Sequence, residues 1–84
     1  MLLENIRQTC SACPSQWEAK TVNGRPVYIR YRSGWLTVQM GEVGDEVITV
    51  AKKDPLLKIK LGDNLDGHIE YNMISYFIQK IYIL

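Results

Sequence analysis

The sequence predicts an α+β fold, an antiparallel β-meander of four or five strands with a C-terminal helix packed on one face. Three observations support this prediction. Apolar and polar side chains alternate along residues 16–40, and the turn signals Asn23-Gly24 and Ser33-Gly34 divide this stretch into three strands. Residues 69–81 instead repeat apolar side chains at helical spacing, which predicts a helix over residues 69–80. A sheet with one apolar face needs a second layer, and this helix would supply it.

The Ser33-Gly34 turn determines how the two strands around it pair. A two-residue loop sets Arg32 opposite Trp35. Counting outward from that pair predicts the other partners, which are Tyr31 with Leu36, Arg30 with Thr37, Ile29 with Val38, Tyr28 with Gln39 and Val27 with Met40. Because side chains alternate between the two faces, the set that includes Arg32 and Trp35 then lies opposite the apolar set.

The Asn23-Gly24 turn allows two loop lengths. A two-residue loop would turn Glu18 and Lys20 toward the apolar face, and burying two charges costs on the order of several kcal/mol. A three-residue loop, Asn23-Gly24-Arg25, avoids this cost and is therefore predicted. It sets Glu18 opposite Arg30 and gives the apolar face three residues of the first strand, Trp17, Ala19 and Thr21.

Two further strands are predicted beyond a glycine-containing loop at residues 41–45. Residues 46–51 are rich in β-branched side chains and predict a fourth strand. Residues 57–61 alternate apolar side chains with lysines and predict a fifth, whose lysines suit an exposed edge. For residues 74–84 a strand competes with the helix, because Ile, Tyr and Phe dominate there.

The remaining segments are less regular. Residues 1–8 fit either a helical turn or a short strand, and residues 10–15 predict a turn that contains a proline. Residues 62–67 predict a loop in which Asp63 or Asp66 caps the following helix. The same loop superficially resembles a calcium-binding EF-hand loop, but the spacing of its acidic residues does not fit that motif.

Length and charge narrow the class of protein. A chain of 84 residues makes a single domain, 1–84, and its net charge of +1 gives no bulk attraction to nucleic acid or membrane. Glu4 and Arg7 interrupt the first ten residues, so no secretory signal is expected. The apolar C-terminal run carries Gln79 and Lys80 and is shorter than the ~20 residues that span a bilayer. A soluble cytoplasmic protein without membrane contact is expected.

Cys10 and Cys13 have the spacing of metal ligands. A closed zinc site needs four ligands, however, and His68 is the only other good one in the sequence. The spacing also occurs in redox dithiols, but no βαβ unit follows here. The favoured interpretation is two packed or partly exposed thiols, with metal binding and redox chemistry as alternatives. His68 has no nucleophile fixed beside it, so it is interpreted as a surface histidine, and neither an enzyme nor a cofactor is expected.

The polar face of the predicted sheet is the best candidate for a binding site. It brings together Tyr28, Arg30, Arg32 and Trp35, with Lys20 at the edge. This mixture is typical of protein–protein hot spots, and aromatic and arginine side chains also stack on bases or bind phosphate. Cross-strand stabilisation explains part of it, through a Glu18–Arg30 pair and an Arg32–Trp35 stack worth ~0.5–1 kcal/mol.

Three short runs carry a resemblance, CPSQW (13–17), GRPVYIRYR (24–32) and GDNLDG (62–67). The sequence from about residue 10 to residue 71 resembles small uncharacterised proteins of bacteria and their phages. The resemblance implies no activity. It implies a small phage- or mobile-element-type protein, a class whose members often bind and block one host complex, such as a CRISPR effector.

Together these observations predict a small non-enzymatic interaction module that binds a protein through its polar sheet face. A nucleic-acid-binding domain that uses the same face is the first alternative. A metal or redox protein that uses Cys10 and Cys13 is the second.

Overall fold

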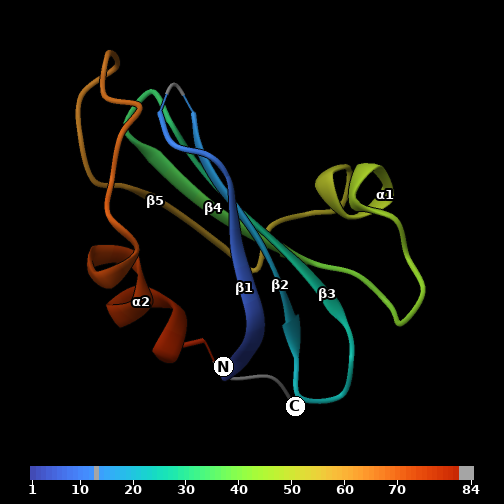
Figure 1. The fold of residues 1–84 in the computed structure, drawn as a ribbon. Helices are drawn as coiled ribbons and strands as arrows, with labels where there is room; N and C mark the ends of the chain where they lie inside the picture. The colour runs from blue at the N-terminus through green and yellow to red at the C-terminus, as the bar shows by residue number, and fades with distance from the viewer. Residues whose placement is uncertain (13, 82–84) are drawn as a thin grey trace.

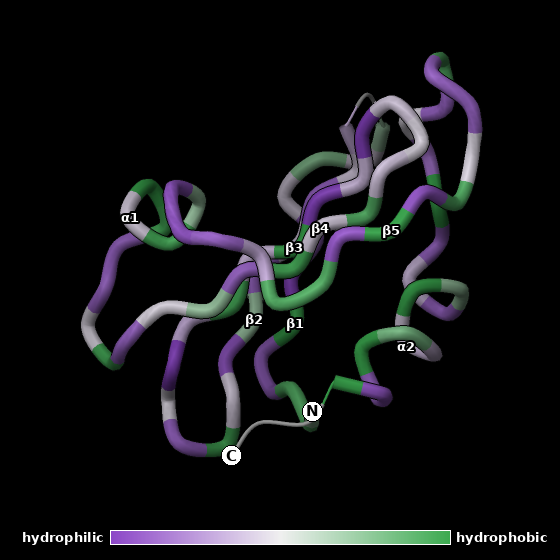
Figure 2. The backbone as a smooth tube through the Cα atoms, turned by 180° about the vertical axis from the view of Figure 1, so that it is seen from behind, coloured by the Kyte–Doolittle hydropathy of each residue, from purple (hydrophilic) through white to green (hydrophobic). Residues whose placement is uncertain are grey.

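The computed structural model describes residues 1–12 and 14–81. Its centre is a five-stranded antiparallel sheet in the order β1-β2-β3-β4-β5. The strands are β1 (Leu3–Cys10), β2 (Ser15–Thr21), β3 (Pro26–Arg32), β4 (Trp35–Met40) and β5 (Leu57–Lys60). Two short helices, α1 (Val47–Ala51) and α2 (Tyr71–Gln79), lie on opposite sides of the sheet (Figures 1 and 2). The predicted antiparallel meander followed by a C-terminal helix is confirmed.

The pairing of β3 with β4 agrees with the prediction at every position. Arg32 lies opposite Trp35, and the other five partners follow in the predicted order. Ser33 and Gly34 both take positive φ angles, 54° and 77°, which a two-residue hairpin turn of the favoured type requires. This register therefore follows from local turn chemistry.

The pairing of β2 with β3 is shifted by two residues from the prediction. Ala19 lies opposite Val27 and Glu18 opposite Tyr28, so the predicted Glu18–Arg30 pair is wrong. The loop is Val22-Asn23-Gly24, because the Thr21 N–H donates to the Arg25 carbonyl at 2.9 Å and the Arg25 N–H donates to Thr21 Oγ1 at 3.1 Å. A shift of two leaves the faces unchanged, and the β2 residues predicted to be buried are buried: Trp17, Ala19 and Thr21.

Residues 46–51 do not form the predicted fourth strand, since they contain helix α1. Only Val50 of this helix is buried, and it packs so closely on Gly41 that a Cβ there would lie 2.6 Å from Val50 Cγ2. The free edge of β4 is taken by β5, which confirms the predicted lysine-bearing strand. Residues 46–51 therefore pack through Val50 at the end of the sheet, because β5 already occupies the edge of β4 with which they would pair.

The N-terminal segment, for which helix and strand were both open, forms β1 and pairs with β2. Its register is broken between Glu4 and Arg7 and again between Gln8 and Cys10. Asn5 takes a positive φ of 54° within the first irregularity. Such bulges interrupt the alternation of side chains, which explains why residues 1–8 show no strand pattern in the sequence.

The core lies on one face of the sheet. Its members come from β2, β3, β4 and α2, and they are Trp17, Ala19, Val27, Ile29, Tyr31, Leu36, Val38, Ile74 and Ile78. Hydrophobic and hydrophilic residues alternate along β5 (Figure 2), and Leu57 and Ile59 pack against this core. Within the described residues, no helix has the length and apolar character needed to cross a membrane.

Helix α2 lies within the predicted range of residues 69–80, and the competing strand, predicted for residues 74–84, is wrong for residues 74–79. Residues 82–84 lie outside the described part of the chain. Its N-cap is Glu70, which makes no side-chain capping bond, so neither Asp63 nor Asp66 is the cap. Asp63 Oδ1 instead accepts the Leu65 N–H at 2.9 Å. Asp66 accepts the phenolic hydrogen of Tyr31, so both aspartates organise their own loop.

The loop before α2 is tied to the β1–β2 connection through Ser15. Ser15 is fully buried, and its hydroxyl donates to the Ser11 carbonyl at 2.6 Å and accepts the Ile69 N–H at 3.3 Å. The Gly67 carbonyl oxygen, 3.2 Å from Ser15 Oγ, is a second acceptor within reach of the same hydrogen. His68 lies against the same connection, with Nδ1 2.9 Å from the Ser11 carbonyl oxygen. These contacts fix the start of α2 relative to the sheet.

Candidate functional site: a basic and aromatic patch on the open sheet face

The face opposite the core carries a cluster of cations around a tryptophan. β4 pairs with β5 so that Trp35 lies opposite Lys60 and Thr37 opposite Lys58. Thr37 also lies opposite Arg30, and Trp35 opposite Arg32. We call this cluster the basic-aromatic patch; its members are Arg30, Arg32, Trp35, Lys58 and Lys60.

Trp35 is the aromatic centre of the basic-aromatic patch and is 40% exposed. Lys58 Nζ lies 5.2 Å and Lys60 Nζ 5.4 Å from the centre of its ring, both within cation–π range. The cation predicted to stack on Trp35 was Arg32, which lies directly across the turn from it. Arg32 is instead exposed, and the cations over the ring are the two lysines. The lysines take this place because β5 pairs alongside β4. Their alternation in the sequence indicates an edge strand but gives no sign that they belong to the site.

The two arginines of the patch form no ion pair within the part of the chain that the structure describes. Among the described residues, neither Arg30 nor Arg32 has a carboxylate within 4 Å. Arg30 is half-buried, and its Nε is fully buried without a hydrogen-bond partner in that same part of the chain. A charge held in place without a counter-ion is available to an anion from outside.

A shallow depression of about 200 Å³ opens between these side chains. It is lined by Arg30, Arg32, Ser33, Trp35 and Thr37. Thr37 Oγ1 donates to the Arg30 carbonyl over 3.4 Å. Two arginines, a serine, a threonine and a tryptophan therefore line one small space.

Tyr28, another predicted site residue, takes a structural role next to the patch. Its hydroxyl donates to Gln16 Oε1 at 2.8 Å. Burial raises the pKa of the Tyr28 hydroxyl, and the nearby Arg30 charge opposes this shift. Tyr28 thus supports the floor of the open face through a neutral hydrogen bond.

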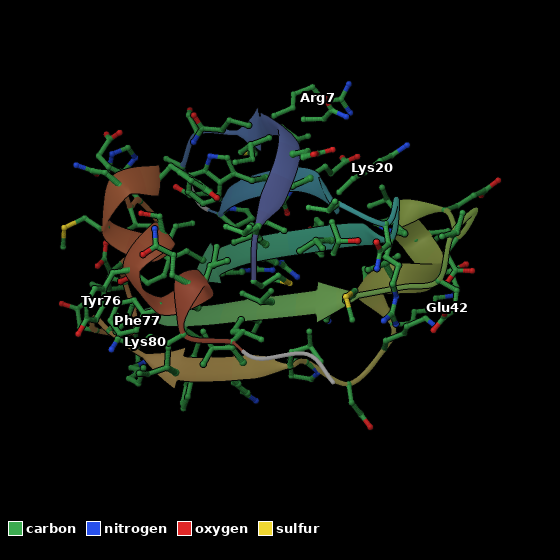
Figure 3. All side chains as sticks on the ribbon, turned by 90° about the horizontal axis from the view of Figure 1, so that it is seen from below. Arg7, Lys20, Glu42, Tyr76, Phe77 and Lys80 are labelled. Atoms are coloured by element: carbon green, nitrogen blue, oxygen red, sulfur yellow. The ribbon has the colours of Figure 1, made fainter. Side chains whose placement is uncertain are left out.

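Lys20 lies apart from the patch. It lines a separate cleft of about 570 Å³ near α1, together with Arg7, Glu18, Asp45 and Glu46. Arg7 pairs with Glu18 at 3.3 Å across β1 and β2. In Figure 3, Lys20 and Arg7 lie toward the β1 edge of the sheet, and Tyr76, Phe77 and Lys80 lie at the end that carries α2. The open face is therefore polarised, with unpaired cations near the Ser33-Gly34 turn and mixed charges near α1.

The thiol hypothesis rests on Cys10 and Cys13, and Cys13 lies outside the described residues. Cys10 is a half-buried free thiol at the end of β1. His68 contacts Ser11 in the connection that joins the two cysteines, and its other ring nitrogen, Nε2, lies 3.0 Å from Glu70 Oε1. No three potential metal ligands gather within residues 1–12 and 14–81, and metal and redox roles for this pair stay predictions.

A second groove of about 410 Å³ lies where α2 meets the loop before it. Its lining is mainly apolar and includes Leu61, Ile69, Met73 and Phe77. The charged groups at its rim already have partners. Asp66 accepts a hydrogen bond from Tyr31, and Glu70 Oε1 lies 3.0 Å from His68 Nε2. It therefore offers fewer free polar groups than the basic-aromatic patch.

No protein-family model, curated protein or solved structure matches the chain. Function has to be inferred from the residues themselves, and above all from the basic-aromatic patch.

Proposed function

We propose that this chain is a non-enzymatic interaction module that binds an acidic surface of a protein partner through the basic-aromatic patch. One observation carries the proposal. Four cations, which have no carboxylate partner among the described residues, surround a tryptophan that is 40% exposed.

The energetics of interfaces support this proposal. Covering apolar area yields about 25 cal/mol per Å², and tryptophan and arginine are the residue types most enriched at binding hot spots. The unpaired cations favour a partner of opposite charge and suppress partners of like charge. Clustered cations also speed association with an acidic partner at low salt, even though the net charge of the whole chain is only +1.

The test is capture of partners from the native host followed by a binding assay with variants. Trp35→Ala combined with Arg32→Ala removes the exposed ring and the exposed guanidinium. We expect it to stay folded, with a modest loss from the broken lysine–tryptophan contacts, and to lose binding. A circular-dichroism melt checks the fold.

The matched control is Tyr76→Ala combined with Arg7→Ala, which removes an aromatic side chain 58% exposed on α2 and an exposed arginine on β1, neither of them a member of the patch. It should bind like the wild type. Intact binding of the Trp35/Arg32 variant would refute the proposal and direct attention to the groove beside α2. A collapsed fold in that variant would show that Trp35 is a core residue.

Single-stranded nucleic acid is the second candidate partner, because an exposed ring among cations suits base stacking and phosphate contact. Salt dependence separates the two partners. Phosphate contacts give a steep loss of affinity as salt rises, with a slope near 0.7 per phosphate for single strands. A fluorescence titration with a single-stranded oligonucleotide at several salt concentrations measures this slope.

The resemblance to small phage proteins adds one expectation, that the partner is a host complex which binding blocks. This expectation depends on the identity of the captured partner. Recovery of a host complex whose activity falls when the protein is added would support it.

A further inference from the structure

We infer that the depression at Arg30, Arg32 and Trp35 binds a phosphate monoester, so that the partner is a protein segment phosphorylated at the contact site. This inference rests on the proposed function, since it names the chemistry of that partner. The depression measures about 200 Å³, which is below the range of about 300–1,000 Å³ typical of drug-sized ligands. It suits one tetrahedral anion and the group attached to it.

The lining supplies donors of the kind that phosphate requires. Arg30 and Arg32 are two residues apart on β3, so both guanidinium groups project from the same face. A guanidinium group binds two oxygens of a phosphate at once, with charge-assisted bonds about twice as strong as neutral ones. Ser33 and Thr37 line the same depression, and each carries a hydroxyl group of the kind that donates to phosphate oxygens.

The local charge favours a dianion over a single carboxylate. The Arg30 Nε is buried without a partner among the described residues, so this guanidinium has donor capacity that no internal bond uses. Lys58 and Lys60 do not line the depression, but their Nζ atoms lie 5.2 and 5.4 Å from the centre of the Trp35 ring, which does. Lys60 Nζ also donates to the Ser33 carbonyl and to Asn64 Oδ1. A phosphate monoester carries about −1.5 to −2 charges at neutral pH and offers three acceptor oxygens to such a cluster.

The extent of the positive region favours a phosphorylated protein over a nucleic acid strand. Beyond the patch, the open face leads toward the cleft that Glu18, Asp45 and Glu46 line with Arg7 and Lys20. A strand that crossed the sheet would bring its phosphates toward these carboxylates. One isolated phosphate needs only the cations near the Ser33-Gly34 turn.

The experiment is an NMR titration of the full chain with phenyl phosphate and with phenyl sulfate. Both probes carry one ring and one tetrahedral anion, but only the phosphate becomes a dianion near neutral pH. We expect phenyl phosphate to shift the Nε–H signals of Arg30 and Arg32 and the indole N–H signal of Trp35. Its affinity should exceed that of phenyl sulfate by roughly 1.5-fold to fivefold, as expected for one extra charge at an exposed site.

Variants locate the site. Arg32→Gln removes an exposed guanidinium and should weaken phenyl phosphate binding to the level of the sulfate. Arg30→Gln should do the same, and the Arg32 variant keeps the test valid if this half-buried substitution unfolds the protein. Arg25→Gln is the control, because Arg25 lies outside the depression and pairs with Glu42 at 2.9 Å. It should bind like the wild type.

Equal affinity for the two probes, or shifts confined to other cations, would overturn the inference. Its failure is distinguishable from failure of the proposed function. If phosphatase treatment of a captured partner leaves patch-dependent binding unchanged, the phosphate inference fails and the interaction module stands. If single-stranded nucleic acid shifts the same signals with a steep salt slope while captured proteins do not depend on the patch, both fail.

Discussion

Tyr31 donates its phenolic hydrogen to Asp66 Oδ2 at 2.5 Å, and this bond joins the middle strand of the sheet to a loop 35 residues later. The ring of Tyr31 is buried in the core, with 1% of its surface exposed. The same loop accepts the Gly34 N–H at the Asp66 carbonyl, over 2.8 Å. Asp66 therefore holds both the core tyrosine and the hairpin turn beside the basic-aromatic patch.

Tyr31→Phe should lower the free energy of unfolding by about 1.5–3 kcal/mol, because the half-buried Asp66 carboxylate loses its charge-assisted bond. Urea denaturation measures the change. Tyr28→Phe is the control, since its hydroxyl bonds only the neutral Gln16 amide and should cost about 0.5–1.5 kcal/mol. Equal losses for the two variants would show that the Tyr31–Asp66 bond has no special weight.

Alkaline pH should remove the advantage of Tyr31 over phenylalanine. Burial, and then the bond to Asp66, raise the pKa of the Tyr31 hydroxyl from its ordinary value of 10.0 to about 12. The unfolded chain releases this proton first, so stability falls as pH rises from about 10 to about 12. Tyr31→Phe lacks this loss, and the difference in unfolding free energy between the two proteins should shrink over that interval. A constant difference would contradict the raised pKa.

Gly34 should tolerate a side chain less well than Gly24. Both take positive φ, 77° and 83°, and alanine at such an angle costs about 1–2 kcal/mol. A Cβ at Gly24 meets nothing within 4 Å, whereas at Gly34 it would lie 2.2 Å from the Gly62 carbonyl oxygen. We expect Gly34→Ala to cost about 1–3 kcal/mol more than Gly24→Ala in thermal or urea unfolding. Similar losses would mean that the Gly62 loop moves aside freely.

Local chemistry decided which parts of the fold could be predicted. The Ser33-Gly34 turn fixes the β3–β4 register without help from distant residues, and the apolar alternation fixes the buried face. The β2–β3 register depended on the Thr21 hydroxyl binding the Arg25 N–H, which turn propensities do not reveal. Residues 46–51 have strand composition, but the edge they would need is taken by β5, so tertiary arrangement overrides propensity.

The candidate site could likewise be predicted only where it depends on local sequence and not on tertiary arrangement. Arg30, Arg32 and Trp35 share a face by alternation alone, and all three line one depression. Lys58 and Lys60 join them only because β5 pairs with β4, a contact between segments about twenty residues apart. Lys20 is on the predicted face but at its mixed-charge end. Alternation predicts which face a side chain lies on, but it does not predict which side chains lie close together along the strands.

His68 should titrate above its ordinary pKa of 6.5. One ring nitrogen lies 2.9 Å from the Ser11 carbonyl oxygen and the other 3.0 Å from Glu70 Oε1. Both neighbours are acceptors, so only the protonated ring can donate to both at once. The Ser11 carbonyl, and then the Glu70 carboxylate, raise the pKa of the His68 ring. The charges that face it are those of Glu70 and Asp66.

A raised pKa makes the protonated ring a stabilising group in the folded state. Its contribution is complete below pH 6.5 and is lost as pH rises through the folded-state pKa. We expect NMR titration of the imidazole carbon-bound protons to give a pKa above 6.5 in the wild type and a lower one in Glu70→Gln. Glu46→Gln, at the start of α1 on the other side of the sheet, is the control and should leave the titration unchanged. A wild-type value at or below 6.5 would show that solvent screens both contacts, and that His68 holds the Ser11 connection as a neutral ring through a single hydrogen bond.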